Sequence, residues 1–214
     1  MQRRTRTLAQ IELLPTELQQ EIMSRDAKFS IDALHNLIIA SPTLADVAAD
    51  PHVYKNINLH TLTVFPLTTL TIYKDLMERC LNAGNVQAHY IRGLQEYFHH
   101  NNIAAGLPHI KIAAEGLYDN TIYLYALIMM CSGQQEIGRT MLDSLGWRTN
   151  KKRADTCWRN IKKSLHGVQV ITLDTTTDAY REAREPITCH RYQMRVRCEH
   201  CYYYKQIYKF TFTV

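Results

Sequence analysis

The sequence predicts a mainly α-helical protein that ends in a small β-type, cysteine-rich piece. Apolar residues recur three and four positions apart over most of the first 166 residues, and prolines and glycines mark the ends of these stretches. From Tyr202 the pattern instead alternates with a period of two. Hydrophobic residues make up 46% and charged residues 21% of the 214, which is the mixture of a folded globular chain.

The first sixty residues predict four short helices joined by tight turns. Thr16 and Gln19 stand three apart in a capping-box arrangement at the start of the first helix, and Ser30 caps the second. Ser41-Pro42 and Asp50-Pro51 each place a side-chain acceptor before a proline, which is the start signal of a helix. Helices this short cannot span a long core. We therefore expect a compact trihelical hook whose apolar face binds a partner.

The middle of the chain contains an internal echo. Residues 88–94 match residues 121–127, 33 positions later, with Gly93 aligned with Ala126. A period near 33 is typical of helix-pair repeats, in which small residues let two helices approach closely.

The second helices of the two repeats are predicted at Leu107–Glu115 and Gln134–Leu145. Two units are fewer than a free-standing array needs, so helices at Pro66–Asn82 and 151–166 are expected to cap them. Beyond residue 166 the pattern predicts a strand over 168–171, a polar loop over 172–185 and an aromatic strand from Tyr202.

Three motifs within residues 11–59 resemble, in their order and spacing, the F-box. They are Leu14-Pro15-x-Glu17-Leu18-x-x-x-Ile22, then Asp32-x-Leu34-x-x-Leu37, then Val47-Ala48-x-Asp50-x-x-Val53-Tyr54-Lys55. The third F-box helix often carries a Cys-Arg or Cys-Lys pair and a bulky aromatic residue, and this chain has Ser41-Pro42 and Val47 there.

Later segments resemble a plant F-box family in which a short tetratricopeptide-like or SEL-type helical region follows the F-box. These segments are Met77-x-x-Cys80-Leu81-Asn82-Ala83-Gly84-Asn85, Ala88-His89-Tyr90-Ile91-x-Gly93, Glu96-Tyr97-Phe98 and the ending Cys198-x-x-Cys201-Tyr202-Tyr203-Tyr204-Lys205. The resemblance implies an F-box over 11–59, a substrate-recruiting helical-repeat domain over 66–166, and a Cys/His and aromatic strand segment over 167–214.

The resemblance also implies a role in ubiquitination. An F-box protein docks on a Skp-type adaptor bound to a cullin, and its remaining domain holds a target protein near the ubiquitin-conjugating enzyme. Such a receptor works by raising effective concentration and needs no catalytic residues. The residues implied as adaptor contacts are Leu14, Pro15, Leu18, Ile22, Leu34, Leu37 and Val53. The same apolar residues would also serve as plain core.

A cluster near the C-terminal end has the spacing of metal ligands. Cys198 and Cys201 lie two residues apart and can grip zinc from one turn, and Cys189 with His190 could complete a tetrahedral structural site. The competing interpretation is a reduced thiol pair packed in a small core, because adjacent residues rarely both reach one metal. Cys157 is a further candidate ligand from outside the cluster.

Composition excludes several other classes. No apolar signal segment precedes residue 13, and the cysteines are scattered except for the last three. The longest apolar run, Ile122–Cys131, is too short for a membrane span. We expect a protein of the cytoplasm or nucleus with free thiols. The net charge of +5 comes without a nucleic-acid reading motif, so a nucleic-acid partner is not expected. No histidine has a partner at a telling catalytic spacing, and no active site is assigned.

Two alternatives to the ubiquitin-ligase subunit stay open. One is a helical-repeat scaffold for protein–protein contacts without a link to ubiquitin. The other is a zinc-containing nucleic-acid binder that uses the basic segment 148–163 and the aromatic strand. Salt would separate them, because nucleic-acid binding weakens steeply as salt is added, whereas an apolar protein contact hardly responds.

Overall fold

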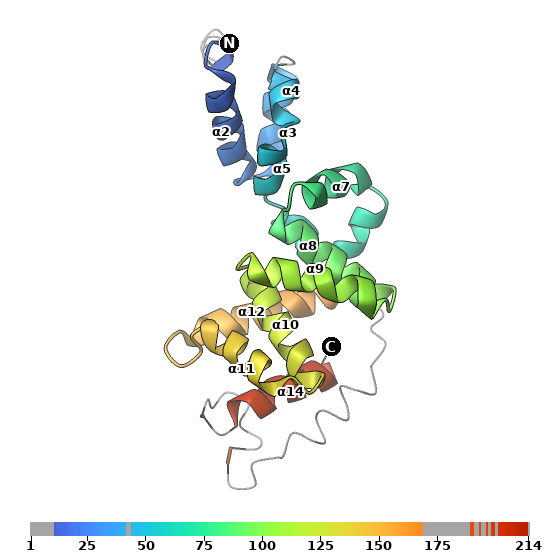
Figure 1. The fold of residues 1–214 in the computed structure, drawn as a ribbon, viewed down its shortest axis with the longest axis vertical. Helices are drawn as coiled ribbons and strands as arrows, with labels where there is room; N and C mark the ends of the chain where they lie inside the picture. The colour runs from blue at the N-terminus through green and yellow to red at the C-terminus, as the bar shows by residue number, and fades with distance from the viewer. Residues whose placement is uncertain are drawn as a thin grey trace. The chain divides into compact units, whose positions relative to one another are not determined.

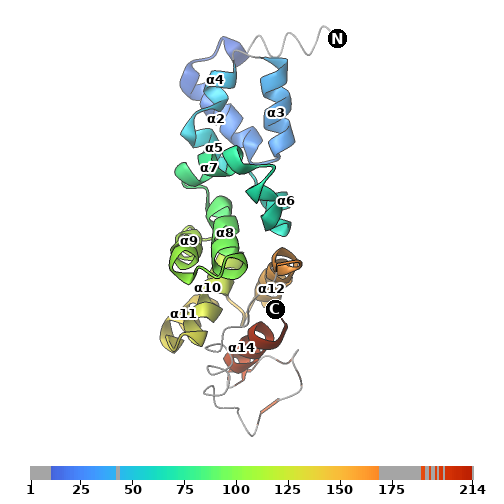
Figure 2. The same cartoon turned by 90° about the vertical axis from the view of Figure 1, so that its right-hand side faces the viewer.

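A computed structural model describes residues 11–41, 44–168, 189–190, 193, 196, 198–199 and 201–213. They belong to two compact units, one reaching to Ile91 and one beginning at Arg92, and each unit is described by itself. Within these ranges the regular elements are all helices, as Figures 1 and 2 show. The prediction of a mainly α-helical protein is confirmed.

The first unit begins with the four predicted short helices. They are α2 (Thr16–Ala27), α3 (Ile31–Ala40), α4 (Leu44–Ala48) and α5 (Pro51–Asn56), followed by α6 (His60–Val64). The start of α5 follows the prediction, because the Asp50 carboxylate accepts a hydrogen bond of 2.7 Å from the backbone N–H of His52. Pro42 lies outside the described residues.

The predicted capping box at the start of α2 is wrong. Pro15 is the N-cap of this helix and makes no side-chain cap. The Gln19 amide instead donates to the carbonyl of Leu14 at 2.8 Å and to that of Glu12 at 3.2 Å. Gln19 therefore fastens the preceding turn to the helix, a contact that the capping-box pattern does not reveal.

The single helix predicted from Pro66 to Asn82 is in fact two pieces. A 3₁₀ helix, η1 (Pro66–Leu70), is separated by a turn from α7 (Lys74–Asn82). The hydroxyls of Thr68 and Thr69 donate to the carbonyls three residues earlier, at 2.6 and 2.8 Å. Such local bonds compete with a regular α-helix, which accounts for the break. Helix α7 is followed by a glycine in the left-handed region, because Gly84 has a φ of +77°.

The core of the first unit draws on every α-helix from α2 to α8 (Val86–Leu94) but not on η1. Its members are Met23, Ala27, Leu34, Leu44, Ala48, Val53, Ile57, Leu59, Leu62, Met77, Cys80, Ala88 and Ile91. One buried amide fixes the start of α8 to the end of α5: Asn85 donates to the carbonyls of Tyr54 and Ile57 at 3.0 and 2.8 Å. Its side-chain oxygen accepts from the N–H groups of Gln87 and Ala88, so the same residue caps α8.

The second unit contains the predicted helix pairs. After a π-helical turn, η2 (Gln95–His99), come α9 (Ile103–Glu115), α10 (Asp119–Cys131), α11 (Gln135–Ser144) and α12 (Lys151–Leu165). Helix α10 packs against α9, α11 and α12 and is buried on nearly all sides. One face of α12 is an apolar stripe, with Ala154, Cys157, Ile161 and Leu165 all buried.

Close crossings explain the small residues of the echo. A Cβ added to Gly93 would lie 2.6 Å from Cγ1 of Ile110 in α9, and one added to Gly138 in α11 would lie 2.5 Å from the carbonyl oxygen of Ala126 in α10. Gly93 and Ala126, the two aligned small residues, therefore both stand at crossings with the second helix of their own pair.

The predicted aromatic strand from Tyr202 is wrong, because Tyr202–Thr213 forms a helix, α14. Tyr202, Gln206 and Phe210 are buried, whereas Tyr208 and Phe212 are exposed. The alternating pattern contained these buried positions four apart, and a spacing of four also fits one face of a helix. The predicted strand over 168–171, apart from Val168, and the loop over 172–185 lie outside the described residues.

Candidate functional site

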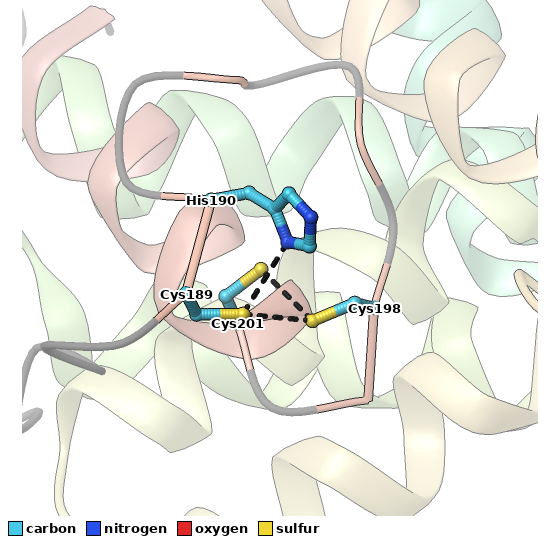
Figure 3. Close-up of side chains that lie close together, drawn as sticks. All are labelled: Cys189, His190, Cys198 and Cys201. Carbon is cyan, nitrogen blue, oxygen red and sulfur yellow. Dashed lines mark hydrogen bonds between the residues drawn. The ribbon is translucent and has the colours of Figure 1, made fainter.

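The structure brings the four predicted metal-ligating residues together at the start of α14 (Figure 3). The ligand atoms of Cys189, His190, Cys198 and Cys201 all lie within 4.8 Å of one another. The Cys198 sulfur lies 3.0 Å from that of Cys189 and 3.4 Å from that of Cys201, and Nδ1 of His190 lies 3.4 Å from the Cys189 sulfur. All three cysteines are free thiols.

The donor set fits zinc. Zinc is held tetrahedrally with Zn–S bonds of about 2.3 Å, which places neighbouring sulfurs about 3.8 Å apart. The sulfur pairs would have to open by less than an ångström to reach that spacing. Three thiolates and one imidazole are one of the standard ligand sets of structural zinc sites.

Hydrogen bonding divides the thiols of this cluster. The hydrogen bond from Cys189 lowers the pKa of Cys198 from 9.0 to about 6, with a further contribution from Cys201. The same contact with Cys198 raises the pKa of Cys189 to about 11. Metals bind the thiolate form, and the lowered pKa favours the thiolate of Cys198. Cys198 is therefore the candidate ligand that needs the least deprotonation on metal binding.

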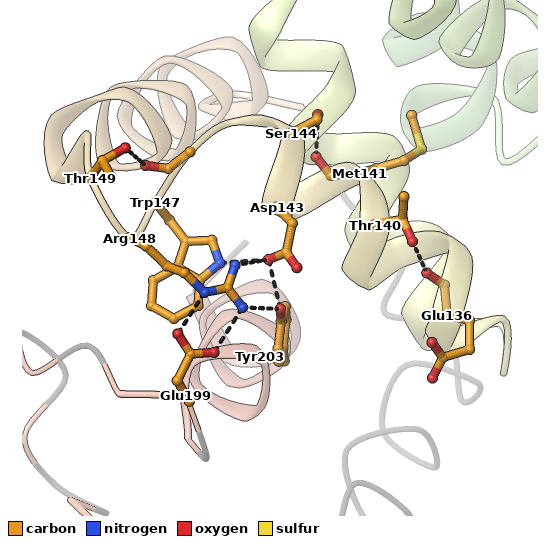
Figure 4. Close-up of polar contacts among 11 residues, drawn as sticks. Glu136, Thr140, Met141, Asp143, Ser144, Trp147, Arg148, Thr149, Glu199 and Tyr203 are labelled. Carbon is orange, nitrogen blue, oxygen red and sulfur yellow. Dashed lines mark hydrogen bonds and ion pairs between the residues drawn. The ribbon is translucent and has the colours of Figure 1, made fainter.

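An ion pair fixes the loop between Cys198 and Cys201 to the turn after α11 (Figure 4). Arg148 donates through Nε and Nη2 to the two carboxylate oxygens of Glu199, at 2.5 and 2.7 Å. The Arg148 guanidinium also lies 4.4 Å from the ring centroid of Trp147. Sequence patterns do not reveal this contact, because 51 positions separate its two residues.

Trp147 and Asp143 extend the contact to α14. The Trp147 ring stacks on Tyr202 with a centroid distance of 3.8 Å and an interplanar angle of 10°. One oxygen of Asp143 accepts hydrogen bonds from Trp147 at 2.7 Å and from Tyr203 at 2.6 Å. Burial opposes ionisation of Asp143, but the bonds from Tyr203, Trp147 and Arg148 hold its pKa below the usual value.

The predicted adaptor contacts fall into two groups. Pro15 and Leu18 are exposed, Leu18 by 51%, and Leu14 and Ile22 are half-buried. Leu34 and Val53 are buried in the core of the first unit. The side chain of Leu37 lies outside the described residues. Leu14, Pro15, Leu18 and Ile22 form a row at the start of α2 and along it. Leu34 and Val53 belong to the core on which α2 packs.

Two exposed apolar residues near this row were not predicted as adaptor contacts. Leu13 is 84% and Ile39 is 65% exposed. The Ser41 hydroxyl donates to the Glu12 carboxylate, which brings the C-terminal end of α3 next to the start of α2. Ile39 belongs to the run Leu37-Ile38-Ile39, and three consecutive apolar residues cannot all face inward from one helix. That run was the available signal.

The other residues predicted as ligands or as a nucleic-acid site have contacts that stabilise the fold. Cys157 lies in the buried stripe of α12, and burial raises its pKa to about 12. Within the basic segment, Arg153 forms a two-bond ion pair with Asp119 at 2.6 and 2.7 Å. The nucleic-acid alternative also loses its aromatic strand, since α14 buries Tyr202 and Phe210. None of the helices that the structure describes is long and apolar enough to cross a membrane.

Comparisons with known proteins agree with the motifs. The family described as plant tetratrico peptide repeats matches residues 61–166 of this chain. An F-box protein of Arabidopsis thaliana is 35% identical over 140 residues, which cover 65% of this chain and 85% of that protein. A putative F-box protein of Arabidopsis thaliana is 27% identical over 133 residues, covering 61% of this chain and 44% of that protein. No solved structure shows a significant match.

Proposed function

This chain belongs to the plant F-box proteins that carry tetratricopeptide-like repeats, and we propose that it is the substrate-recruiting subunit of a Skp–cullin–F-box ubiquitin ligase. In this role it binds a Skp-type adaptor through α2 and α3 and a target protein through the helical pairs of the second unit. It works in the cytoplasm or nucleus and contributes no catalytic residue, because holding the target near the conjugating enzyme raises the effective concentration.

The observation that carries the proposal is the exposed apolar row at the start of α2. Leu13, Pro15 and Leu18 lie exposed there, and Ile39 lies exposed at the adjacent end of α3. A folded protein gains nothing from presenting several large apolar side chains to water in one place, and such clusters mark sites of protein contact. A partner helix could cover this row with its own apolar face.

The test measures adaptor binding with substitutions that leave the core intact. Leu18→Asp combined with Pro15→Ala is expected to weaken binding of a purified Skp-type adaptor by about tenfold or more, because exposed anchors at a contact centre carry most of its energy. Ile72→Asp is the matched control, since Ile72 is 73% exposed in the turn between η1 and α7. A folded wild type that does not bind the adaptor would refute the ligase role and leave the helical scaffold.

The Cys/His cluster is proposed to hold one structural zinc ion. Cys189, His190, Cys198 and Cys201 would supply its four ligands, and the metal would tie the segment before α14 to the helix itself. With all four positions taken by protein atoms, the site is closed, which is the arrangement of structural and not catalytic zinc.

A further inference from the structure

A buried lysine stands one helical turn after the last cysteine of the candidate metal site. Lys205 is only 2% exposed, and its backbone N–H donates to the carbonyl of Cys201 at 3.1 Å. Residues four apart lie on the same face of a helix, and helical side chains slant toward the N-terminal end. Lys205 is therefore directed toward the cysteine cluster.

The contacts of the ammonium group confirm this direction. Nζ of Lys205 donates to the carbonyls of Gln193 at 2.8 Å and Val196 at 2.9 Å. Both carbonyls lie in the segment that joins Cys189 to Cys198. One side chain thus connects α14 to the segment that carries the first two candidate ligands.

The charge of this lysine lacks a carboxylate partner among the residues that the structure describes. Burying a charge is costly unless another charge compensates it, and two backbone carbonyls supply only dipoles. Zinc bound by three thiolates and one neutral imidazole carries one net negative charge. The metal centre would supply the missing counter-charge.

We propose that Lys205 is a positioning residue for the metal centre, which it stabilises by balancing the excess negative charge of a three-thiolate site and by holding the Cys189–Cys198 segment. The role rests on the zinc site proposed above. It differs from the part of Arg148, which binds the carboxylate of Glu199 at the exposed side of the loop. Removal of an outer partner of this kind typically lowers metal affinity by about tenfold to a hundredfold.

Three substitutions separate charge from hydrogen bonding. Lys205→Gln keeps a donor without the charge, Lys205→Met keeps neither, and Lys205→Arg keeps both. We expect Lys205→Gln and Lys205→Met to lower zinc affinity by about tenfold or more in a chelator competition, and Lys205→Arg to lose less. The absorption of the cobalt-loaded proteins should keep its thiolate-to-metal band, since the ligands are unchanged. Wild-type affinity in either neutral variant would overturn the charge role.

A ligand exchange gives a second and independent measurement. Cys189→His turns the set into two thiolates and two imidazoles, which with zinc is neutral. In that protein Lys205→Gln should cost less than about threefold in affinity, because little charge is left to balance. An equal loss of affinity in both backgrounds would show that Lys205 acts only through its hydrogen bonds, and would overturn its charge-balancing role. A wild type that takes up neither zinc nor cobalt would instead refute the metal centre itself.

Discussion

The two donors of Arg148 meet the two carboxylate oxygens of Glu199 side by side, at 2.5 and 2.7 Å. Glu199 lies between Cys198 and Cys201, so this pair joins the turn after α11 directly to the Cys198–Cys201 loop. A two-bond arginine–carboxylate pair fixes orientation as well as distance.

Loss of the Arg148–Glu199 ion pair should make the Cys198–Cys201 loop open more readily. We expect Arg148→Ala to speed the transfer of zinc to a chelator severalfold, because the loop can then open without breaking the ion pair. Arg159→Ala is the control, since Arg159 bonds within α12 to Thr156 and Asp155. Equal rates of zinc loss from wild type and Arg148→Ala would show that the pair is a surface contact of no consequence.

The ligand set predicts which cysteines matter for metal content. Cys201→Ser should lose the zinc of the purified protein and lower the melting temperature, because a structural metal contributes to folding directly. Cys157→Ala should keep the metal, since Cys157 belongs to the core stripe of α12. Elemental analysis measures both. Metal retained after Cys201→Ser would contradict the ligand assignment.

In protein from which a chelator has removed any metal, the labelling rate of each thiol should depend on pH according to the pKa of that thiol. Cys198 has a pKa lowered to about 6, so iodoacetamide should label it at neutral pH, with half the maximal rate near pH 6. Cys189, raised to about 11, should label only at much higher pH. Mass spectrometry of the labelled peptides reads both rates, and Cys80, which is buried, serves as the unreactive control.

The same shifts set the pH dependence of stability in the metal-free protein. The lowered pKa of Cys198 adds stability that is complete above pH 9.0 and is lost as the pH falls through about 6. The raised pKa of Cys189 adds stability that is complete below pH 9.0 and is lost as the pH rises through about 11. Urea unfolding of the metal-free protein at a series of pH values measures both effects, and a free energy of unfolding that does not fall between pH 9 and pH 6 would contradict the role of Cys198.

The close crossing of α10 and α11 should not tolerate a methyl group. Gly138→Ala would place a Cβ 2.5 Å from the Ala126 carbonyl oxygen, and overpacking of this kind costs about 1–3 kcal/mol. Alanine gains about 1 kcal/mol in helix propensity, so a net loss of up to about 2 kcal/mol in the free energy of unfolding, measured with urea, is expected. Thr140→Ala on the exposed face of α11 should be neutral or stabilising. A stabilised Gly138→Ala would show that the crossing can widen.

Local patterns predicted the helix pairs because each depends on residues close together in the chain. Gly93 and Ala126 could be recognised by their shared place in a repeat of 33 residues. The Cys198–Cys201 spacing likewise announced a metal-type cluster. Tyr202 and Phe210 led to the wrong prediction of a strand. Alternating aromatic residues fit the period of a strand, and those four positions apart also fit one face of a helix.

Contacts between distant positions could not be predicted in this way. The contact of Arg148 with Glu199 depends on how the C-terminal piece packs against the helical pairs, and that of Lys205 with Gln193 depends on how Gln193 comes to lie against α14. Leu34 and Leu18 illustrate a second difficulty: both occupy matching motif positions, yet one is buried and the other exposed. A pattern identifies apolar positions, but packing decides which of them face solvent.

Asn85 has a consequence for how this gene could be cut or recombined. A protein cut off after residue 59 would lose the Asn85 amide, which donates hydrogen bonds to the Tyr54 and Ile57 carbonyls. It would also lose core residues, among them Met77, Cys80, Ala88 and Ile91. The N-terminal helices would then lose part of their own interior. An exchange between related genes that preserves both parts would therefore have its breakpoint beyond residue 91.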